Sequence, residues 1–282
     1  MPDVSASARP RGRAARVLAF AALVGGAVVF AYPFVWMLLA TFKPETELSA
    51  LSPVPSVWTA DSYRLVFETI PLGRAFFNSL LVTGAVTASA LVFGSMAAYA
   101  LSKLRWRGRD AAFNAVLFSM MVPGIVLLIP LYTLVVRLGW TNSFAGLIVP
   151  AMMSGTAVLV LRQSFLTIPS ELIDAARMDG ASELRILFRL VWPLSVPALV
   201  TAGILVFIGS WNDVLWPLIV VREEAKMTMP QMVTLFAVGG GAQARLGPQL
   251  AAALLLAVPI VGAYLVFQRH FIASLASTGL KG

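Results

Sequence analysis

The side chains that could do chemistry in this 282-residue chain are few and scattered. There are 13 Asp and Glu residues, one histidine and no cysteine, which excludes a disulfide and a thiol-based metal site. No Ser/His/Asp triad, metal-ligating cluster or paired carboxylate falls within an apolar run. The Gly-x-x-x-x-Gly-Lys-Ser/Thr loop that cradles nucleotide phosphates is also absent. We therefore expect no enzyme activity, no metal and no cofactor bound by this chain, which leaves binding and coupling as its chemistry.

Residues 168–193 form the most charge-rich stretch. Ser170 and Ser182 are predicted N-caps of two short helices, and each is followed directly by a glutamate, which a helix N-terminus favours. Asp179-Gly180 lies between them and predicts a stop and a turn, since glycine adopts positive φ without strain. The stretch is therefore predicted to be a helix–glycine–helix element. These features alone favour a solvated amphipathic loop over a docking element.

The elements that position this stretch are membrane spans. The chain is 59% hydrophobic and 12% charged, whereas soluble domains carry about 25% charged residues. Six charge-free runs are each long enough to cross about 30 Å of hydrocarbon, which takes about 20 helical residues. We predict an all-α polytopic membrane protein with six transmembrane helices and a cytoplasmic helix–Gly–helix coupling loop. The six runs are residues 17–42, 75–102, 111–136, 138–161, 190–212 and 246–268.

Two details of these runs carry further expectations. Pro123-Gly124 interrupts the third run and predicts a kink. Small residues along the second run, Gly94 among them, favour close helix packing. A seventh charge-free run, residues 227–244, contains proline, glutamine and three consecutive glycines. We interpret it as a surface or re-entrant segment.

The formal charge of +8 is explained by membrane topology, so no nucleic-acid partner is expected. With six spans both termini lie on one side, and that side holds 14 of the 21 Lys and Arg residues. The positive-inside rule then places both termini and residues 168–193 in the cytoplasm. The predicted organisation is a basic cytoplasmic tail (1–16), a transmembrane domain with six spans and the loop 168–193 (17–270), and a cytoplasmic C-terminal tail (271–282). The first run is longer than a signal-peptide core, so we expect it to remain as an uncleaved span.

Polar residues in or near the spans are candidates for a substrate pathway. Such residues more often make helix–helix hydrogen bonds or cap helices, so both interpretations stay open. Trp211 and Trp216 could stack on a sugar ring, although an interfacial belt is the commoner role. The pathway candidates are Asn78, Thr83, Asn114, Asn212 and Asp213.

The spacing of residues within 168–193 also matches a known pattern. The pattern has an acid followed by two alanines and, after three further residues, a glycine. After nine further residues come an apolar residue, any residue, a second apolar residue and proline. It is carried by Asp174, Ala175, Ala176, Gly180, Leu190, Trp192 and Pro193. This resembles the EAA loop of ABC importer permeases, from which it departs at three positions: the family pattern has Glu, Ile and Leu where this chain has Asp174, Leu190 and Trp192. Asp174 keeps the charge with a shorter reach. Further matches to the carbohydrate-uptake, maltose-type branch are Asn78-Ser79-Leu80, Tyr99-Ala100-Leu101-Ser102, Trp211-Asn212-Asp213 and Gly279-Leu280-Lys281-Gly282.

The resemblance implies a transmembrane subunit of an ATP-driven importer for a sugar or oligosaccharide, in the bacterial cytoplasmic (inner) membrane. Its partners would be a second permease (as a hetero- or homodimer), two cytoplasmic ABC ATPase subunits that bind ATP and Mg, a periplasmic or lipid-anchored solute-binding protein, and membrane lipid. The residues implied in ATPase coupling are Glu171, Asp174, Ala175, Ala176, Asp179, Gly180 and Pro193.

Two alternatives remain at this point. A permease of the same importer class could carry a non-carbohydrate solute, and the sequence does not name the solute. An autonomous secondary transporter would need ionisable residues near the bilayer midplane, and the apolar runs lack them. A membrane-embedded enzyme is disfavoured by the missing acid–base clusters.

Overall fold

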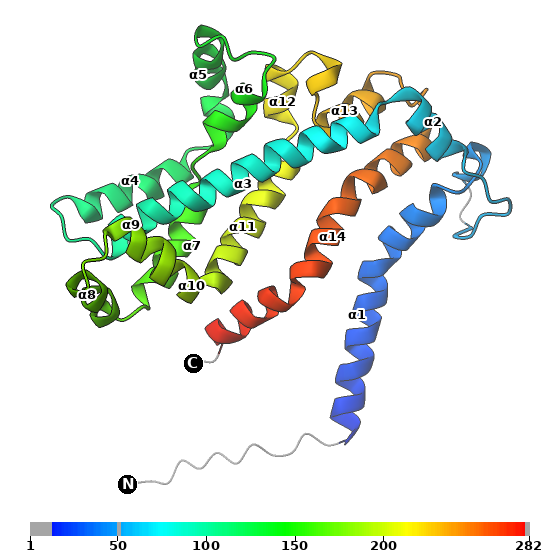
Figure 1. Ribbon diagram of the computed structural model, residues 1–282. Helices are drawn as coiled ribbons and strands as arrows, with labels where there is room; N and C mark the ends of the chain where they lie inside the picture. Colours follow the sequence, from blue (N-terminus) through cyan, green and yellow to red (C-terminus); the bar gives the residue numbers. More distant parts are fainter. Residues whose placement is uncertain (1–12, 50–51, 280–282) are drawn as a thin grey trace. The chain divides into compact units, whose positions relative to one another are not determined.

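The computed structural model describes residues 13–49 and 52–279, and every regular element within them is a helix. This confirms the predicted all-α class. The predicted tails, 1–16 and 271–282, extend beyond the described residues. The α-helices are α1 (Arg13–Ala40), α2 (Asp61–Thr69), α3 (Leu72–Ser102), α4 (Arg109–Met121), α5 (Gly124–Arg137), α6 (Phe144–Ile148), α7 (Gly155–Leu166), α8 (Ser170–Met178), α9 (Glu183–Ile186), α10 (Trp192–Leu194), α11 (Val196–Trp211), α12 (Leu215–Val220), α13 (Met229–Val238) and α14 (Leu246–Gly279) (Figure 1).

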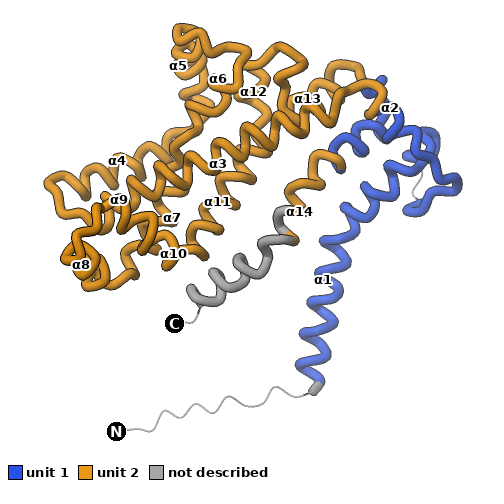
Figure 2. Tube along the Cα trace, viewed as in Figure 1, with its two compact units in different colours: residues 1–66, 242–254 blue, residues 67–241, 255–282 orange. Residues whose placement is uncertain are grey.

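The chain divides into two compact units (Figure 2). The first comprises residues 1–66 and 242–254, with α1, α2 and the start of α14. Within it, the Glu45 carboxylate accepts the backbone N–H groups of Leu246 at 2.6 Å and Gly247 at 3.1 Å. Two of the free N–H groups at the start of α14 are thereby satisfied from a distant loop.

The second unit, residues 67–241 and 255–282, is built around α3. Helices α7 and α11 pack along it, and α13 packs near its N-terminal end (Figure 1). The helices approach closely because small residues face one another: Ala90, Ala98 and Ala157 are fully buried. A Cβ added at Gly94 would lie 3.2 Å from the Ala157 Cβ. Of the small residues on this span, Gly94 therefore lies at the contact with α7.

Prolines break two of the predicted spans. Helices α4 and α5 meet at 99° where Pro123 begins the second of them, so the predicted kink is a full break. The predicted start of the fifth span at residue 190 is wrong. Residues Leu187–Val191 form a π-helix, α10 is a single turn, and α11 begins at Val196 after a 90° bend. The cause is local, since Pro193 and Pro197 remove backbone donors around a bend at Ser195.

Residues 227–244 are not a surface segment. Met229–Val238 form α13, and its side chains Gln231, Met232 and Phe236 are buried. The Ser79 hydroxyl of α3 accepts the Met229 N–H at 2.7 Å. Apolar residues at helical spacing within this run form the buried face of α13. The glycines and polar residues of the run made that face hard to predict from the sequence. The re-entrant interpretation stays a prediction.

Within the described residues, three helices are long and apolar enough to cross a membrane: Ala14–Ala40, Leu72–Ser102 and Phe144–Leu166. Each of the two bent pairs passes the same test as one broken span, which gives up to five. Helix α14 is the remaining candidate, with the shorter apolar stretch Leu246–Gly262 at its start. The total of six spans therefore stays a prediction.

Tight packing at Gly94 generates a stability prediction. We expect Gly94→Val to lower the free energy of unfolding by about 1–3 kcal/mol, because the added atoms overpack the α3–α7 contact. The matched control is Gly84→Val on the same helix, where an added Cβ meets no atom within 4 Å. Thermal unfolding of the detergent-solubilised chain measures both variants. Equal melting temperatures for the two variants would contradict the packing argument.

Candidate functional site

The helix–glycine–helix element is formed as predicted. Helix α8 ends at Met178, Gly180 has φ +74°, and α9 begins at Glu183. The Ala181 N–H bonds the Ala176 carbonyl at 3.0 Å and the Gly180 N–H bonds the Arg177 carbonyl at 2.9 Å. These are the two bonds of a Schellman C-cap, with glycine at its left-handed position. The four-residue spacing from Ala176 to Gly180 is thus the spacing of a helix end.

The two predicted N-caps have different outcomes. Ser182 caps α9, because its hydroxyl accepts the Arg185 N–H at 3.4 Å. The Ser170 cap is wrong: Pro169 occupies the cap position and makes no side-chain cap bond, while Ser170 is already helical. Proline's fixed φ suits the entry to a helix, so the chain turns into α8 one residue earlier than the serine pattern indicated.

Arg177 joins the two helices of the element. Its Nη1 donates to the Asp174 carboxylate at 2.9 Å, and its Nε and Nη2 donate to the two Glu183 oxygens at 2.8 and 3.2 Å. The two-pronged contact with Glu183 fixes geometry as well as charge. The guanidinium holds the pKa of Glu183 below its usual value, against the opposing effect of burial. The contact is therefore intact at neutral pH and is lost only as acid protonates Glu183.

Glu183 also ties the element to α3. The Tyr99 hydroxyl, on the last turns of that helix, donates to the Glu183 carboxylate at 2.5 Å. Lys103, at the C-cap of α3, donates to the Ile168 carbonyl at 2.5 Å just before α8. The Trp192 indole N–H donates to the Ser95 hydroxyl at 3.0 Å. Three side-chain contacts thus fix residues 168–193 to the C-terminal half of one long helix.

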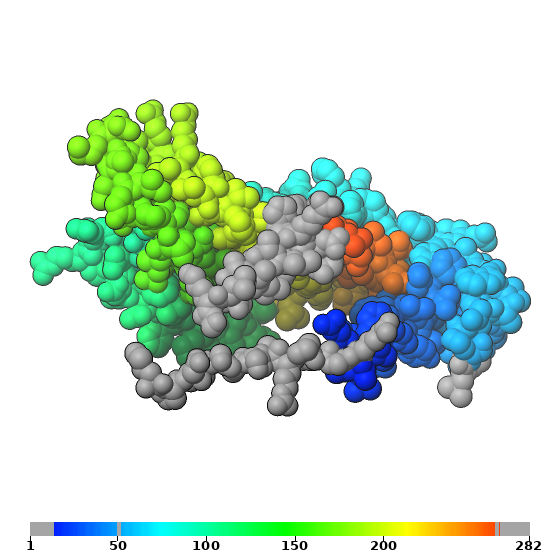
Figure 3. All heavy atoms as spheres, turned by 90° about the horizontal axis from the view of Figure 1, so that it is seen from below, coloured from blue at the N-terminus to red at the C-terminus, as the bar shows by residue number. Residues whose placement is uncertain are grey.

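The element has an inner and an outer face. Ile173 and Ile186 are each 1% exposed and anchor it in the core. On the outer face Leu172 is 44% exposed and Met178 is 89% exposed. In the space-filling view, the yellow-green atoms of this part of the chain form a lobe that projects from the second unit (Figure 3). An exposed methionine beside acidic side chains is a surface suited to a protein partner.

The predicted coupling residues fall largely on this outer face. Ala176 is half-buried, because it packs with Ala181 behind the Schellman turn. Pro193 is exposed at the bend before α11. The exposed members within α8 and its turn are Glu171, Asp174, Ala175, Asp179 and Gly180.

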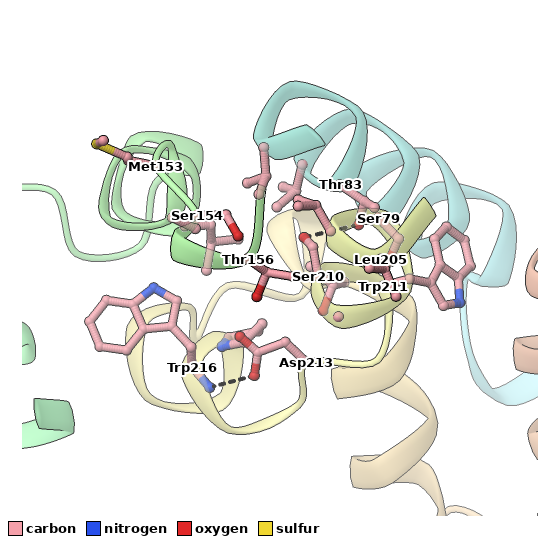
Figure 4. Close-up of a pocket in the computed structure, with 18 residues that line it drawn as sticks. Ser79, Thr83, Met153, Ser154, Thr156, Leu205, Ser210, Trp211, Asp213 and Trp216 are labelled. Carbon is pink, nitrogen blue, oxygen red and sulfur yellow. Dashed lines mark hydrogen bonds between the residues drawn. The ribbon is translucent and has the colours of Figure 1, made fainter. Parts of the chain in front are cut away.

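A second candidate site is a cavity of about 480 Å³ in the same unit, inside the range of about 300–1,000 Å³ that ligand pockets occupy. Its walls come from α3, the start of α7, α11 and the segment from Asp213 to Thr228 (Figure 4). Thr83 and Tyr99 are 16 residues apart on α3, so about 24 Å of helix separates this cavity from the coupling element. One helix therefore contributes to both sites.

Two of the five pathway candidates line the cavity, Thr83 and Asp213. Asn78 does not: its amide donates to the Ala225 and Met227 carbonyls, both at 3.0 Å, and so clamps a loop. Asn212 bonds the Ile208 carbonyl of its own helix at 3.0 Å, and Asn114 lies exposed on α4. For Asn78 and Asn212 the structure therefore shows hydrogen bonds within the fold, which was the other interpretation of these pathway candidates.

Sequence reasoning missed several hydroxyls of the cavity. Thr228 lies in the run interpreted as a surface or re-entrant segment, and Thr156 and Ser210 lie in α7 and α11. Isolated Ser and Thr residues carry no sequence signal, because only the folded arrangement brings them together. Trp216 lines the cavity, with its indole N–H fixed on the Gly146 carbonyl at 3.0 Å.

Comparison with known proteins finds one family match, described as "Binding-protein-dependent transport system inner membrane component", over residues 90–274. The chain is 37% identical over 262 residues to the arabinooligosaccharides transport system permease protein AraQ of Halalkalibacterium halodurans, covering 91% of this chain and 93% of that protein. It is 34% identical over 252 residues to the trehalose transport system permease protein SugB of Mycobacterium tuberculosis, covering 89% and 92%.

A solved structure is similar as well. A chain of a bacterial ABC transporter involved in the import of the acidic polysaccharide alginate matches with a TM-score of 0.79 and 25% identity. The match covers 92% of this chain and 98% of that one. The fold described above is therefore the fold of a known permease chain over nearly its whole length.

The Tyr99–Glu183 contact generates a prediction about the coupling element. Tyr99→Phe removes one hydrogen bond to a charged acceptor, which contributes about 1–2 kcal/mol. We expect backbone amides of residues 176–186 to exchange with solvent about five- to thirtyfold faster, as measured by hydrogen–deuterium exchange. Tyr132→Phe on α5 is the matched control, because Tyr132 lies outside the element. Unchanged exchange in 176–186 would show that Tyr99 does not hold the element in place.

Proposed function

The chain belongs to the family of binding-protein-dependent transport system inner membrane components, and on that premise we propose that it is the permease subunit of an ATP-driven importer for a sugar or oligosaccharide. The observation that carries the proposal is the projecting helix–glycine–helix element on a chain that has no nucleotide-binding loop. Relatives named for arabinooligosaccharides and trehalose support a sugar as the cargo.

In this proposal the energy comes from outside the chain. Two cytoplasmic ABC ATPase subunits bind ATP and Mg, and this chain binds neither. The outer face of α8 docks in a cleft of one ATPase, with Leu172 and Met178 packing and Glu171 and Asp179 pairing with basic groups. The small Ala175 permits close approach. Asp174 already pairs with Arg177, so its role is to orient α8 as much as to contact the partner.

The contacts around Glu183 give a route for coupling. A displacement of α8 by the ATPase is passed through Arg177 to Glu183, and from Glu183 to Tyr99 on α3. Helix α3 carries Thr83 in the wall of the cavity. Movement at the cytoplasmic end of α3 therefore alters the cavity about 24 Å away.

A second permease, as a homo- or heterodimer partner, supplies the other half of the pathway, and a periplasmic or lipid-anchored solute-binding protein delivers the cargo. The chain is a multi-pass protein of the bacterial inner membrane, with both termini and residues 168–193 on the cytoplasmic side. The excess of Lys and Arg on that side supports this orientation.

Copurification and uptake test the assembly together. The tagged chain is expected to bring down an ATPase with a phosphate-binding loop, and uptake of labelled sugar into proteoliposomes is expected to require ATP. Sugar uptake that persists without any ATPase would instead establish an autonomous secondary transporter. ATP-dependent uptake confined to a non-carbohydrate solute would keep the importer and replace its cargo.

A substitution at Gly180 tests docking. We expect Gly180→Asp to insert in the membrane and assemble with the second permease, yet to lower ATP-dependent uptake at least tenfold. The added Cβ meets no atom of this chain within 4 Å, so the variant acts on the partner's surface by adding bulk and charge.

Gly139→Asp is the matched control for that variant. Gly139 also has positive φ, at 69°, and also has open space around it, but it lies in the turn after α5. Both variants carry the same modest left-handed strain, which aspartate tolerates better than most residues. If the two lose uptake equally, backbone strain is the cause and docking at Gly180 is refuted.

A further inference from the structure

The cavity between α3, α7 and α11 has an unusual lining for a membrane helix bundle. Six of its side chains carry hydroxyl groups and one carries a carboxylate, Asp213. Among the described residues, no lysine, arginine or histidine lines it. The hydroxyl residues are Ser79, Thr83, Ser154, Thr156, Ser210 and Thr228. Such a lining offers many neutral hydrogen bonds and a single negative charge.

Thr228 is the sharpest indication that the lining serves a ligand. The residue is 4% exposed, and its hydroxyl has no hydrogen-bond partner among the described residues. A buried hydroxyl without a partner costs stability, so such groups are rare unless something else pairs with them. Thr87, Ser195 and Gln231 also have an unpaired buried atom, but of the four only Thr228 lines the cavity, where its hydroxyl can pair with a group that enters.

Asp213 presents the only charge among the described residues that line the cavity. One of its oxygens accepts the Trp216 N–H at 3.3 Å, the Leu215 N–H also bonds the carboxylate, and it makes no ion pair in the described part of the chain. A carboxylate accepts about four hydrogen bonds, so part of its capacity is unused. Figure 4 shows the Thr156 side chain directed toward the same space as the Asp213 carboxylate. Adjacent sugar hydroxyls can donate to such a carboxylate while accepting from the threonine.

Trp216 forms an apolar wall beside these groups. Its ring is held in place by the indole bond to the Gly146 carbonyl, and it lies to one side of Asp213 in the cavity (Figure 4). A fixed aromatic face covers the C–H face of a sugar ring, while the hydroxyls at the ring edge meet the polar side chains. Wall and polar groups together match the two kinds of surface on a sugar.

We propose that this cavity binds an uncharged sugar unit directly, with Asp213 and Thr228 as the groups that recognise its hydroxyls, and that it excludes acidic sugars. The proposal rests on the proposed importer function and adds the class of cargo that this subunit selects. An acidic sugar would meet the Asp213 carboxylate and find no cation among the lining residues to pair with. Burying an unpaired anion is unfavourable whatever its exact position.

Coulomb's law sets the size of the exclusion. Two like charges about 4 Å apart disfavour binding roughly fivefold in a water-like medium and roughly a thousandfold at an effective dielectric constant of about 20. The lower bound alone separates a neutral from an acidic sugar in a binding assay. Tight recognition is unnecessary, because a transport pathway must also release its cargo.

The test measures binding to the detergent-solubilised importer complex without its solute-binding protein and without nucleotide, so that the signal belongs to the permeases. Saturation-transfer NMR at millimolar concentration compares three uncharged probes (trehalose, maltotriose and arabinotriose) with the acidic probe trigalacturonate. We expect at least one uncharged probe to bind, and trigalacturonate to bind at least fivefold more weakly. Trigalacturonate binding as well as or better than every uncharged probe would overturn the proposal.

Substitutions in the lining test whether the binding signal comes from this cavity. Asp213→Asn is expected to weaken binding of the uncharged probe at least tenfold. Thr228→Val is expected to weaken it about three- to tenfold without lowering the melting temperature, because the hydroxyl has no protein partner to lose. Glu224→Gln is the matched control, since this carboxylate lies exposed on the segment beyond α12 and outside the cavity. If Asp213→Asn and Thr228→Val both bind like Glu224→Gln, the cavity is not the binding site.

These outcomes are separable from a failure of the proposed function. If the chain is not an importer subunit, no ATPase copurifies and no uptake depends on ATP, whatever Asp213 does. If the importer function holds and this inference fails, ATP-dependent uptake is present but unaffected by Asp213→Asn and Thr228→Val.

Discussion

One carboxylate, Glu183, joins the two helices of the helix–glycine–helix element to each other and to α3. It receives two hydrogen bonds from Arg177 of α8 and one from Tyr99 of α3. Without Glu183 the guanidinium would lose its two-pronged partner, and α8 would keep only the Asp174 pair within its own helix. Because Glu183 is the first residue of α9, its position depends in turn on the Gly180 turn and the Ser182 cap. Short-range backbone geometry thus positions the carboxylate that joins α8 and α9 to Tyr99 of α3.

The rest of the second unit packs around α3, the helix that carries Tyr99, the partner of Glu183. Helix α3 carries Tyr99 near one end and Ser79 and Thr83 near the other. Close packing at Gly94 and Ala157 joins it to α7 between these two ends. A helix packed this closely bends and slides little, so it transmits displacement as a nearly rigid body. The breaks are elsewhere, at Pro123 before α5 and at Ser195 before α11, where prolines permit movement between segments.

The sequence predicts what local chemistry determines. The all-α class and the family were confirmed, because charge-free runs and the spacing from Asp174 to Pro193 are properties of the chain alone. The glycine turn was predictable because Gly180 stands at the spacing of a Schellman cap. Expectations were wrong where the local structure depended on an adjacent residue or on a helix packed against the segment. Pro169 displaced the Ser170 cap, and packing on α3 buried one face of Met229–Val238 within the run where a surface or re-entrant segment was expected.

The cavity was the least predictable feature, for a physical reason. Its hydroxyl residues come from α3, α7, α11 and the segment before α13, and each is a single polar side chain in a largely apolar neighbourhood. Such a residue usually bonds its own helix, as Ser89 does with the Ala85 carbonyl at 2.7 Å. Thr228 differs only because its hydroxyl finds no partner once it is buried. The absence of a partner is a property of the fold and not of the sequence, so a site built from such groups becomes visible only when the surroundings of each hydroxyl are known.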